Sequence, residues 1–166
     1  MLKKWCHILM KNKMLTNLVN KLIEKKLTIS CCESLTGGLF AAEIVKISGA
    51  SNTFRGGYVT YQDIAKEILL PNAKEVLEEV GAISEKMAIL MAETVKNQLK
   101  TNIAVSFTGN AGPISSENKE VGLVYIGIIF NDNKEVYELH LKGNRQEIRH
   151  NCISFVNDKL LLMIEK

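Results

Sequence analysis

Residues 28–38 form the stretch with the clearest chemical potential, Thr-Ile-Ser-Cys-Cys-Glu-Ser-Leu-Thr-Gly-Gly. Its first half is apolar and β-prone and predicts a short buried strand, whereas its second half is a turn of small residues ending in Gly37 and Gly38. The next run, residues 39–46, favours a helix with apolar side chains on one face. This order places the hydroxyls of Ser34 and Thr36 beside the free N–H groups of a helix N-terminus, where an anion or a developing oxyanion is stabilised.

The same stretch also allows a plainer interpretation, in which it is a structural turn and the two glycines only provide backbone freedom. It contains no Gly-Lys-Ser/Thr of a Walker loop, no Gly-x-Gly-x-x-Gly and no Gly-x-Ser-x-Gly elbow of the hydrolases. Catalysis by Ser34 would require a base from elsewhere in the chain, because a serine hydroxyl is a weak nucleophile alone.

The base is better sought among the lysines than among the histidines. The three histidines, at positions 7, 140 and 150, fall in the amino-terminal segment, a predicted hairpin and the last predicted helix, so a Ser-His-Asp triad has no support. Lys66 can serve if desolvation keeps its amine neutral. With Tyr61 at a strand end and Lys66 one turn into the next helix, both can turn toward Ser34. The alternative is an edge tyrosine and a solvated lysine.

Strands and helices alternate around these residues. Strands are predicted at 27–32, 58–61, 103–107, 121–130 and 135–141. Helices are predicted near 15–23, 38–47, 64–70, 73–80, 84–99 and 143–160, with Ser84 as an N-cap and Pro71 as a stop. This alternation predicts an α/β fold, a three-layer α/β/α sandwich with a mixed sheet of about five strands.

In such sheets ligands bind beyond the carboxyl ends of the strands, where residues 33–38, 61–66 and 108–113 should meet. The last of these segments is a second glycine loop, with Thr108, Gly109 and Gly112. Arg145 and Arg149 lie one helical turn apart and could grip a phosphate, or they form an ordinary solvated face. Glu33 either orders the turn that follows it or pairs with Lys66.

The composition indicates one globular domain. The chain has 166 residues and a net charge of +3, but residues 1–26 hold seven lysines and one glutamate, a charge of +6, which leaves −3 for the rest. A mildly acidic body without a basic aromatic patch argues against a nucleic-acid partner. We expect residues 1–13 to be a ragged extension before a single domain at 14–166; the alternative for the extension is an amphipathic helix on a membrane surface.

The cysteines and the hydropathy add further expectations. The four cysteines form no Cys-x-x-Cys pair and do not cluster with histidines, so a zinc site is not expected. Adjacent Cys31 and Cys32 should point to opposite faces of a strand and pack as small apolar residues. Free thiols and the lack of a secretory signal fit the cytoplasm. No apolar run is long enough to span a bilayer, so no membrane partner is expected.

Six segments carry a family resemblance. They are Glu33-Ser34-Leu35-Thr36-Gly37-Gly38; Gly49-Ala50-Ser51-x-x-Phe54-x-Gly56-Gly57-x-Val59-x-Tyr61-x-x-x-Ala65-Lys66; Gly81-Ala82-Ile83-Ser84-Glu85; Thr108-Gly109-Asn110-Ala111-Gly112-Pro113; Val121-Gly122-x-Val124-Tyr125; and Gly143-Asn144-Arg145-x-x-Ile148-Arg149. In order and spacing they resemble the CinA carboxy-terminal domain family of competence-damage-inducible proteins, over about residues 15–164. Stand-alone members of that family include nicotinamide-nucleotide amidohydrolases.

The resemblance implies hydrolysis of the carboxamide of nicotinamide mononucleotide to nicotinic acid mononucleotide and ammonia. It implies Ser34 as nucleophile with Tyr61 and Lys66 as its partners, a pyridine nucleotide as the small-molecule partner, and no metal or other cofactor. Glu33, residues 36–38, Thr108, Gly109, Gly112 and the two arginines are then the expected substrate contacts. The sequence is compatible with a monomer or a homo-oligomer.

Several positions depart from the pattern of the family. Leu35 replaces a common cysteine, Asn110 replaces an isoleucine, Ile114-Ser115-Ser116 replaces a glycine-rich run, and Gln62-Asp63 alters the segment before Lys66. These changes affect the pocket wall more than the nucleophile. An alternative function is therefore a non-catalytic nucleotide-binding or partner-binding module that retains the pocket.

Overall fold

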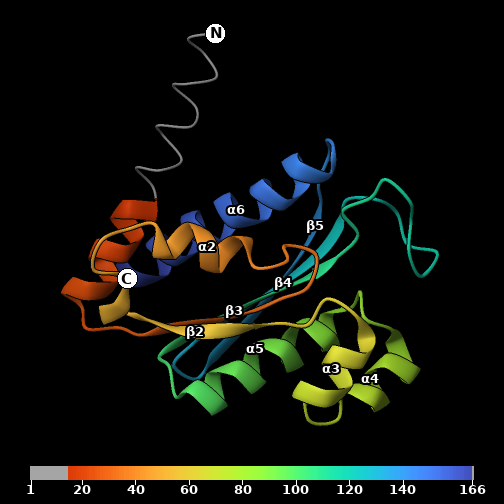
Figure 1. The fold of residues 1–166 in the computed structure, drawn as a ribbon, viewed down its shortest axis with the longest axis horizontal. Helices are drawn as coiled ribbons and strands as arrows, with labels where there is room; N and C mark the ends of the chain where they lie inside the picture. Colours follow the sequence, from red (N-terminus) through yellow and green to blue (C-terminus); the bar gives the residue numbers. More distant parts are fainter. Residues whose placement is uncertain (1–14, 166) are drawn as a thin grey trace, which may run out of the picture.

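A mixed five-stranded sheet forms the middle layer of the computed structural model, which describes residues 15–165 (Figure 1). The strands are β1 (Ile29–Glu33), β2 (Phe54–Val59), β3 (Ile103–Gly109), β4 (Leu123–Phe130) and β5 (Asn133–His140), in the order β2-β1-β3-β4-β5. Strand β1 is parallel to both β2 and β3, whereas the β3–β4 and β4–β5 pairs are antiparallel. The predicted mixed sheet is confirmed.

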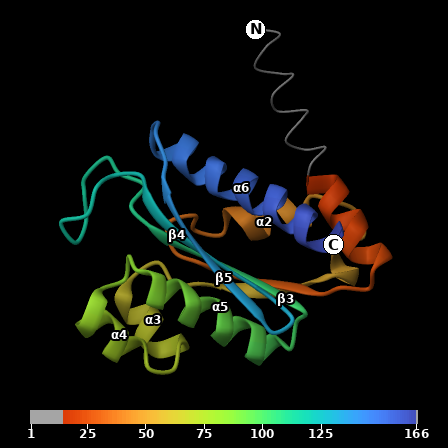
Figure 2. The same cartoon turned by 180° about the vertical axis from the view of Figure 1, so that it is seen from behind.

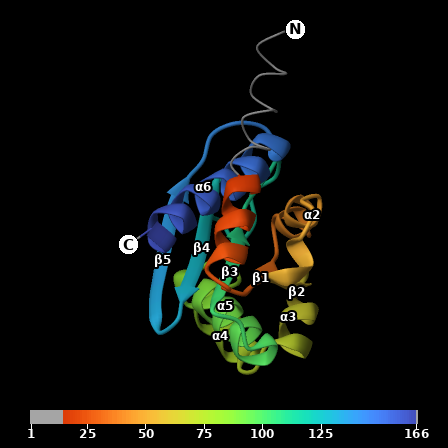
Figure 3. The ribbon, with the colours of Figure 1, turned by 90° about the vertical axis from the view of Figure 1, so that its left-hand side faces the viewer.

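Helices cover both faces of this sheet, as the two opposite views show (Figures 1 and 2). One face carries a helix over residues 15–24 together with α2 (Leu39–Val45) and α6 (Arg145–Glu165). The other carries α3 (Asp63–Leu69), α4 (Ala73–Val80) and α5 (Glu85–Leu99). Figure 3 shows the three layers edge-on, which confirms the predicted α/β/α sandwich.

Strand β1 lies inside the sheet, and all five of its residues are buried. Cys31 belongs to the core beneath α6, and Cys32 belongs to the core beneath α5, because side chains alternate along a strand. Burial raises the pKa of the Cys32 thiol to about 12 and that of Cys31 well above its usual value. Both cysteines are therefore protonated packing residues at neutral pH, as predicted.

Strand β2 differs from its predicted bounds, because it begins at Phe54 and includes both glycines. Gly57 lies against β1 so closely that a Cβ atom there would be 2.3 Å from the carbonyl oxygen of Cys31. Since the strand ends at Val59, Tyr61 lies in the connection to α3.

The helix N-caps follow the sequence signals. The Ser84 hydroxyl accepts a hydrogen bond from the Met87 amide at 3.2 Å, so the predicted cap of α5 is confirmed. At the start of α6, the Asn144 side-chain oxygen accepts from the amides of Gln146 and Glu147 at 3.0 and 3.1 Å.

The far end of α6 lies beside the end of the helix over residues 15–24. Lys25 Nζ donates to the carbonyl oxygen of Ile164 at 2.6 Å, and Lys21 forms an ion pair with Glu165 at 3.7 Å. Within residues 15–165, no helix is long and apolar enough to cross a membrane. The expectations for residues 1–13 lie outside the described residues.

Candidate active site

A cavity of about 270 Å³ opens at the carboxyl end of the three parallel strands. Its lining combines the segments that follow β1, β2 and β3 with the start of α6 and the connection between α4 and α5. Among the predicted residues, those that line it are Ser34, Tyr61, Lys66, Thr108, Gly109, Gly112 and Arg145. The predicted nucleophile and its two predicted partners therefore share one cavity.

The turn after β1 is fixed by its backbone. The Ser34 amide donates to the Phe107 carbonyl at 2.9 Å, which continues the β1–β3 ladder by one residue, and the Ser34 carbonyl accepts from Gly37 at 3.0 Å. Gly37 and Gly38 have φ values of 58° and 90°, a region that other residues rarely adopt. The two glycines are needed here for conformation, and Ser34 is left at the cavity with 8% of its surface exposed.

Glu33 orders this turn instead of pairing with Lys66. Its side chain has no exposed surface, and its two carboxylate oxygens accept from the amides of Phe40 and Ala41, at 3.1 and 2.9 Å. These amides belong to the first turn of α2 and have no partner within the helix. The acidic group also complements the positive end of the helix dipole. The sequence left open whether Glu33 orders the turn or pairs with Lys66, and these hydrogen bonds show that it orders the turn.

Arg149 holds the same turn from the side of α6. Its Nε and Nη2 atoms both donate to the Thr36 carbonyl oxygen, at 3.2 and 2.5 Å, and its Nη1 atom donates to Gln146 Oε1 at 3.1 Å. The Thr36 hydroxyl is buried and has no hydrogen-bond partner among the described residues. Five of the predicted substrate contacts do not line the cavity, namely Glu33, Thr36, Gly37, Gly38 and Arg149.

Lys66 and Tyr61 reach the cavity in different environments. Lys66 is 1% exposed, and its Nζ lies 3.2 Å from Asp63 Oδ1. Tyr61 is 54% exposed, and its hydroxyl accepts from Arg145 Nη2 at 2.7 Å. Arg145 Nη1 also donates to the Gly112 carbonyl at 2.8 Å, so its guanidinium bridges two walls of the cavity.

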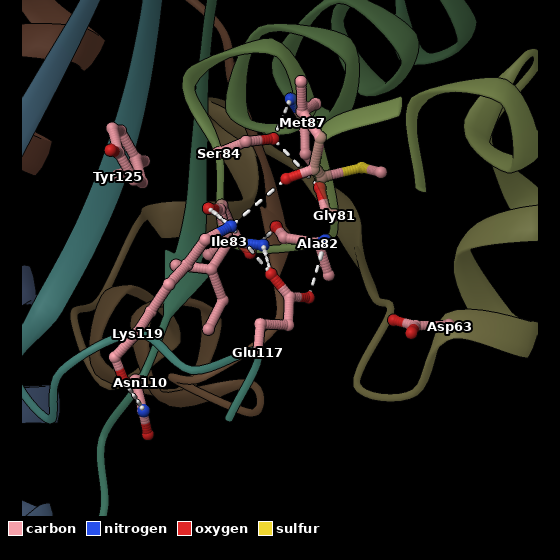
Figure 4. A network of polar contacts seen from close by, with 12 residues as sticks. Asp63, Gly81, Ala82, Ile83, Ser84, Met87, Asn110, Glu117, Lys119 and Tyr125 are labelled. Carbon is pink, nitrogen blue, oxygen red and sulfur yellow. Dashed lines mark hydrogen bonds and ion pairs between the residues drawn. The ribbon is translucent and has the colours of Figure 1, made fainter. Parts of the chain in front are cut away.

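A polar network holds the loop after β3 against the α4–α5 connection (Figure 4). Glu117 accepts from the amides of Ala82 and Ile83 at 2.8 and 3.2 Å, and Lys119 Nζ donates to Glu117 at 2.9 Å. Burial raises the pKa of Glu117, but the hydrogen bonds from Lys119 and the two amides outweigh it and hold that pKa below its usual value. This carboxylate is therefore ionised at neutral pH and acts as part of the wall.

Two further contacts brace the same wall. The Thr108 hydroxyl donates to the Ala82 carbonyl at 2.5 Å, and Asn110 Nδ2 donates to the Lys119 carbonyl at 3.0 Å. Sequence reasoning missed Glu117 and Lys119, whose spacing in a polar loop does not differ from that of solvated charges.

Within residues 15–165, no group of three His, Cys, Asp or Glu side chains could hold a metal ion.

The sequence matches known proteins over most of its length. The family model of the CinA C-terminal domain matches residues 11–164. A competence-damage inducible protein from Bacillus mycoides is 44% identical over 138 residues, which cover 82% of this chain and 34% of that protein. A relative of the same description from Bacillus cytotoxicus is 43% identical over 137 residues, 81% of this chain and 33% of that protein. The chain thus spans about a third of the length of these relatives.

Solved structures with the same fold agree with the sequence match. The competence/damage inducible protein CihA from Agrobacterium tumefaciens has a TM-score of 0.87 at 30% identity, covering 94% of this chain and 96% of that chain. A CinA superfamily protein from Klebsiella pneumoniae has a TM-score of 0.89, covering 93% of this chain and 98% of that chain. At 24% identity, the Klebsiella protein indicates a shared fold alone.

The capping role of Glu33 can be tested by its effect on stability. Glu33→Ala leaves the Phe40 and Ala41 amides of α2 without an acceptor, so we expect the free energy of unfolding in urea to fall by about 2–3 kcal/mol. Glu33→Gln keeps one acceptor oxygen and should lose less. Glu78→Ala, at an exposed position of α4, is the control and should change stability by less than about 0.5 kcal/mol. Equal effects of the two alanine variants would contradict the assigned role.

Proposed function

The chain belongs to the CinA C-terminal domain family, and on this premise we propose that it hydrolyses the carboxamide of nicotinamide mononucleotide, giving nicotinic acid mononucleotide and ammonia. The observation that carries the proposal is the single cavity that Ser34, Tyr61 and the buried Lys66 line together. The family includes amidohydrolases of this kind, and an amide needs a nucleophile and a base within reach of one carbonyl group.

In the proposed reaction, Ser34 Oγ attacks the carboxamide carbon while the neutral Lys66 amine takes the hydroxyl proton. The tetrahedral intermediate collapses when Lys66 returns this proton to the departing nitrogen, which leaves as ammonia, and an ester on Ser34 remains. Water then attacks the ester while Lys66 takes a proton from it, and Lys66 returns this proton to Oγ as the bond between Oγ and the acyl carbon breaks, which releases the carboxylic acid and the free serine. In each of the two steps, Lys66 takes up one proton and gives it back.

Backbone amides beside the nucleophile are available for the oxyanion. The Leu35 amide follows Ser34 directly, and within the described residues neither it nor the Thr36 amide donates to an acceptor. Leu35 also lines the cavity. We assign the Leu35 amide as an oxyanion donor, because fixed dipoles aimed at the developing charge lower the barrier most effectively.

Asp63 orients the proposed base. Lys66 is almost fully buried, and its Nζ lies 3.2 Å from Asp63 Oδ1 at the cavity. Tyr61 stands beside the Arg145 guanidinium and is the group proposed to pass protons between the cavity and solvent.

The phosphate of the nucleotide is assigned to Arg145. This side chain lines the cavity, and its planar guanidinium donates to the Tyr61 hydroxyl and the Gly112 carbonyl. A phosphate dianion is a stronger acceptor for a guanidinium than either of these groups. Arg149 is committed to the Thr36 carbonyl, so its proposed part is to support the turn.

The nucleophile is tested by Ser34→Ala. We expect ammonia release from nicotinamide mononucleotide to fall by about a thousandfold or more, because no other hydroxyl would attack in its place. The control is Ser115→Ala in the exposed loop, with circular dichroism confirming that both variants are folded. Near-normal release by a folded Ser34→Ala protein would exclude the covalent route. No release by the unsubstituted protein would favour a non-catalytic binding module.

The base is tested by Lys66→Arg. Arginine stays charged and cannot accept the serine proton, so kcat/KM should drop by about a hundredfold or more, nearly as far as in Lys66→Ala. Lys74→Arg, at an exposed position of α4, should retain normal turnover. If a folded Lys66→Arg enzyme kept its rate, Lys66 would act only as a fixed positive charge.

The phosphate site is tested by Arg145→Ala in binding experiments. We expect the affinity for nicotinamide mononucleotide to fall about tenfold further than the affinity for nicotinamide riboside, which lacks the phosphate. Arg55→Ala is a matched control, since Arg55 likewise donates to two oxygen atoms, the carbonyls of Leu99 and Lys100, and does not line the cavity. Equal losses for the two ligands would place the phosphate elsewhere.

A further inference from the structure

Two carboxylates line the cavity, and they are not equivalent. Both oxygens of Glu117 are occupied, by the amides of Ala82 and Ile83 and by Lys119. Asp63 uses Oδ1 for Lys66, whereas its Oδ2 has no partner within residues 15–165, and its side chain is 58% exposed. Figure 4 draws Asp63 apart from the hydrogen-bonded group of Glu117, and no dashed line joins the two. Of the two carboxylates, Asp63 is the one with an oxygen available to a ligand.

The ion pair of Asp63 is unlike an ordinary surface pair on a helix. Such pairs join two solvated side chains three or four residues apart and contribute little to stability. Here the cationic partner, Lys66, is almost fully buried and faces the same cavity as Ser34. The carboxylate is therefore placed beside the proposed chemistry, at the boundary between a buried lysine and the cavity.

The proposed substrate carries a matching charge. In a nicotinamide nucleotide, the ring nitrogen bonds to ribose and is therefore cationic, and it lies meta to the carboxamide. When the carboxamide carbon is at Ser34, the positive ring must lie within one ring width of this carbon. Lys66 must reach Ser34 to take its proton, and Asp63 is in contact with Lys66. The ring charge and the Asp63 carboxylate therefore fall within the same small part of the cavity.

We propose, on the basis of the proposed function, that Asp63 determines specificity by binding the cationic pyridinium ring and thereby selects it over neutral ring amides. A carboxylate at the edge of a partly enclosed cavity attracts a cation more strongly than one in bulk water does. The ring then shares the Asp63 carboxylate with Lys66, through the oxygen that Lys66 leaves free.

The test compares two ligands that differ in ring charge. Nicotinamide mononucleotide has a cationic ring, whereas its reduced dihydropyridine form is neutral and keeps the carboxamide, ribose and phosphate. Dissociation constants are measured by calorimetry in the Ser34→Ala protein, which binds without turnover. Asp63→Asn should raise the dissociation constant of the oxidised nucleotide by about tenfold and that of the reduced nucleotide by less than about threefold. Asp63→Glu keeps the charge and should restore most of the preference.

The controls separate this inference from the proposed function. Glu67→Gln changes an exposed carboxylate of the same helix outside the cavity, and it should leave both dissociation constants unchanged. Equal weakening of the two ligands by Asp63→Asn would overturn the role of Asp63, while ammonia release by the unsubstituted enzyme would still support the proposed function. If the unsubstituted protein releases no ammonia and the Ser34→Ala protein binds neither nucleotide, both proposals fail.

Discussion

The buried carboxylate of Glu33 is the constraint on which the site depends. A carboxylate without exposed surface is tolerated only where hydrogen bonds replace its lost hydration. The Phe40 and Ala41 amides provide them, so α2 must begin directly above the end of β1. The chain can return over so short a distance because Gly37 and Gly38 adopt left-handed conformations. The position of Ser34 between β1 and α2 follows from this geometry, and the contact from Arg149 to the Thr36 carbonyl links it to the packing of α6.

The charges around the cavity already have partners within the protein. Lys66 pairs with Asp63, Arg145 donates to Tyr61 and Gly112, and Glu117 is held by Lys119 and two backbone amides. The hydrogen bonds of Glu117 join the loop after β3 to the α4–α5 connection and fix this wall of the cavity. The Lys66–Asp63 and Arg145–Tyr61 contacts involve the exposed side chains of Asp63 and Tyr61, so a ligand could replace either contact without disturbing the core. Each of these charged side chains thus has a partner within the protein, and two of the contacts lie where a ligand could take the place of a partner.

Much of the architecture could be predicted from the sequence, because its signals are local. The apolar run of β1 and the cap at Ser84 fixed elements within a few residues of their observed positions, and the alternation of strands and helices indicated the layers. Contacts between distant segments could not be predicted in this way: Glu117 binds amides more than thirty residues earlier in the chain. The role of Glu33 stayed open because a helix N-terminus and a lysine both satisfy a carboxylate. The bounds of β2 were missed because glycine is a poor strand former. The strand contains glycine at position 57 because the close approach to Cys31 leaves no room there for a side chain.

Helix α6 connects the cavity with the opposite end of the molecule. Arg145 is its first residue, and its last turn contacts the helix over residues 15–24 through Lys25 and Ile164. A helix of 21 residues is about 30 Å long. The last turn of α6 and the end of the helix over residues 15–24 therefore lie together, about a helix length from Arg145. An affinity tag or a fluorescent protein joined after α6 would be attached a helix length away from Arg145, so a carboxy-terminal fusion is suited to studying the cavity.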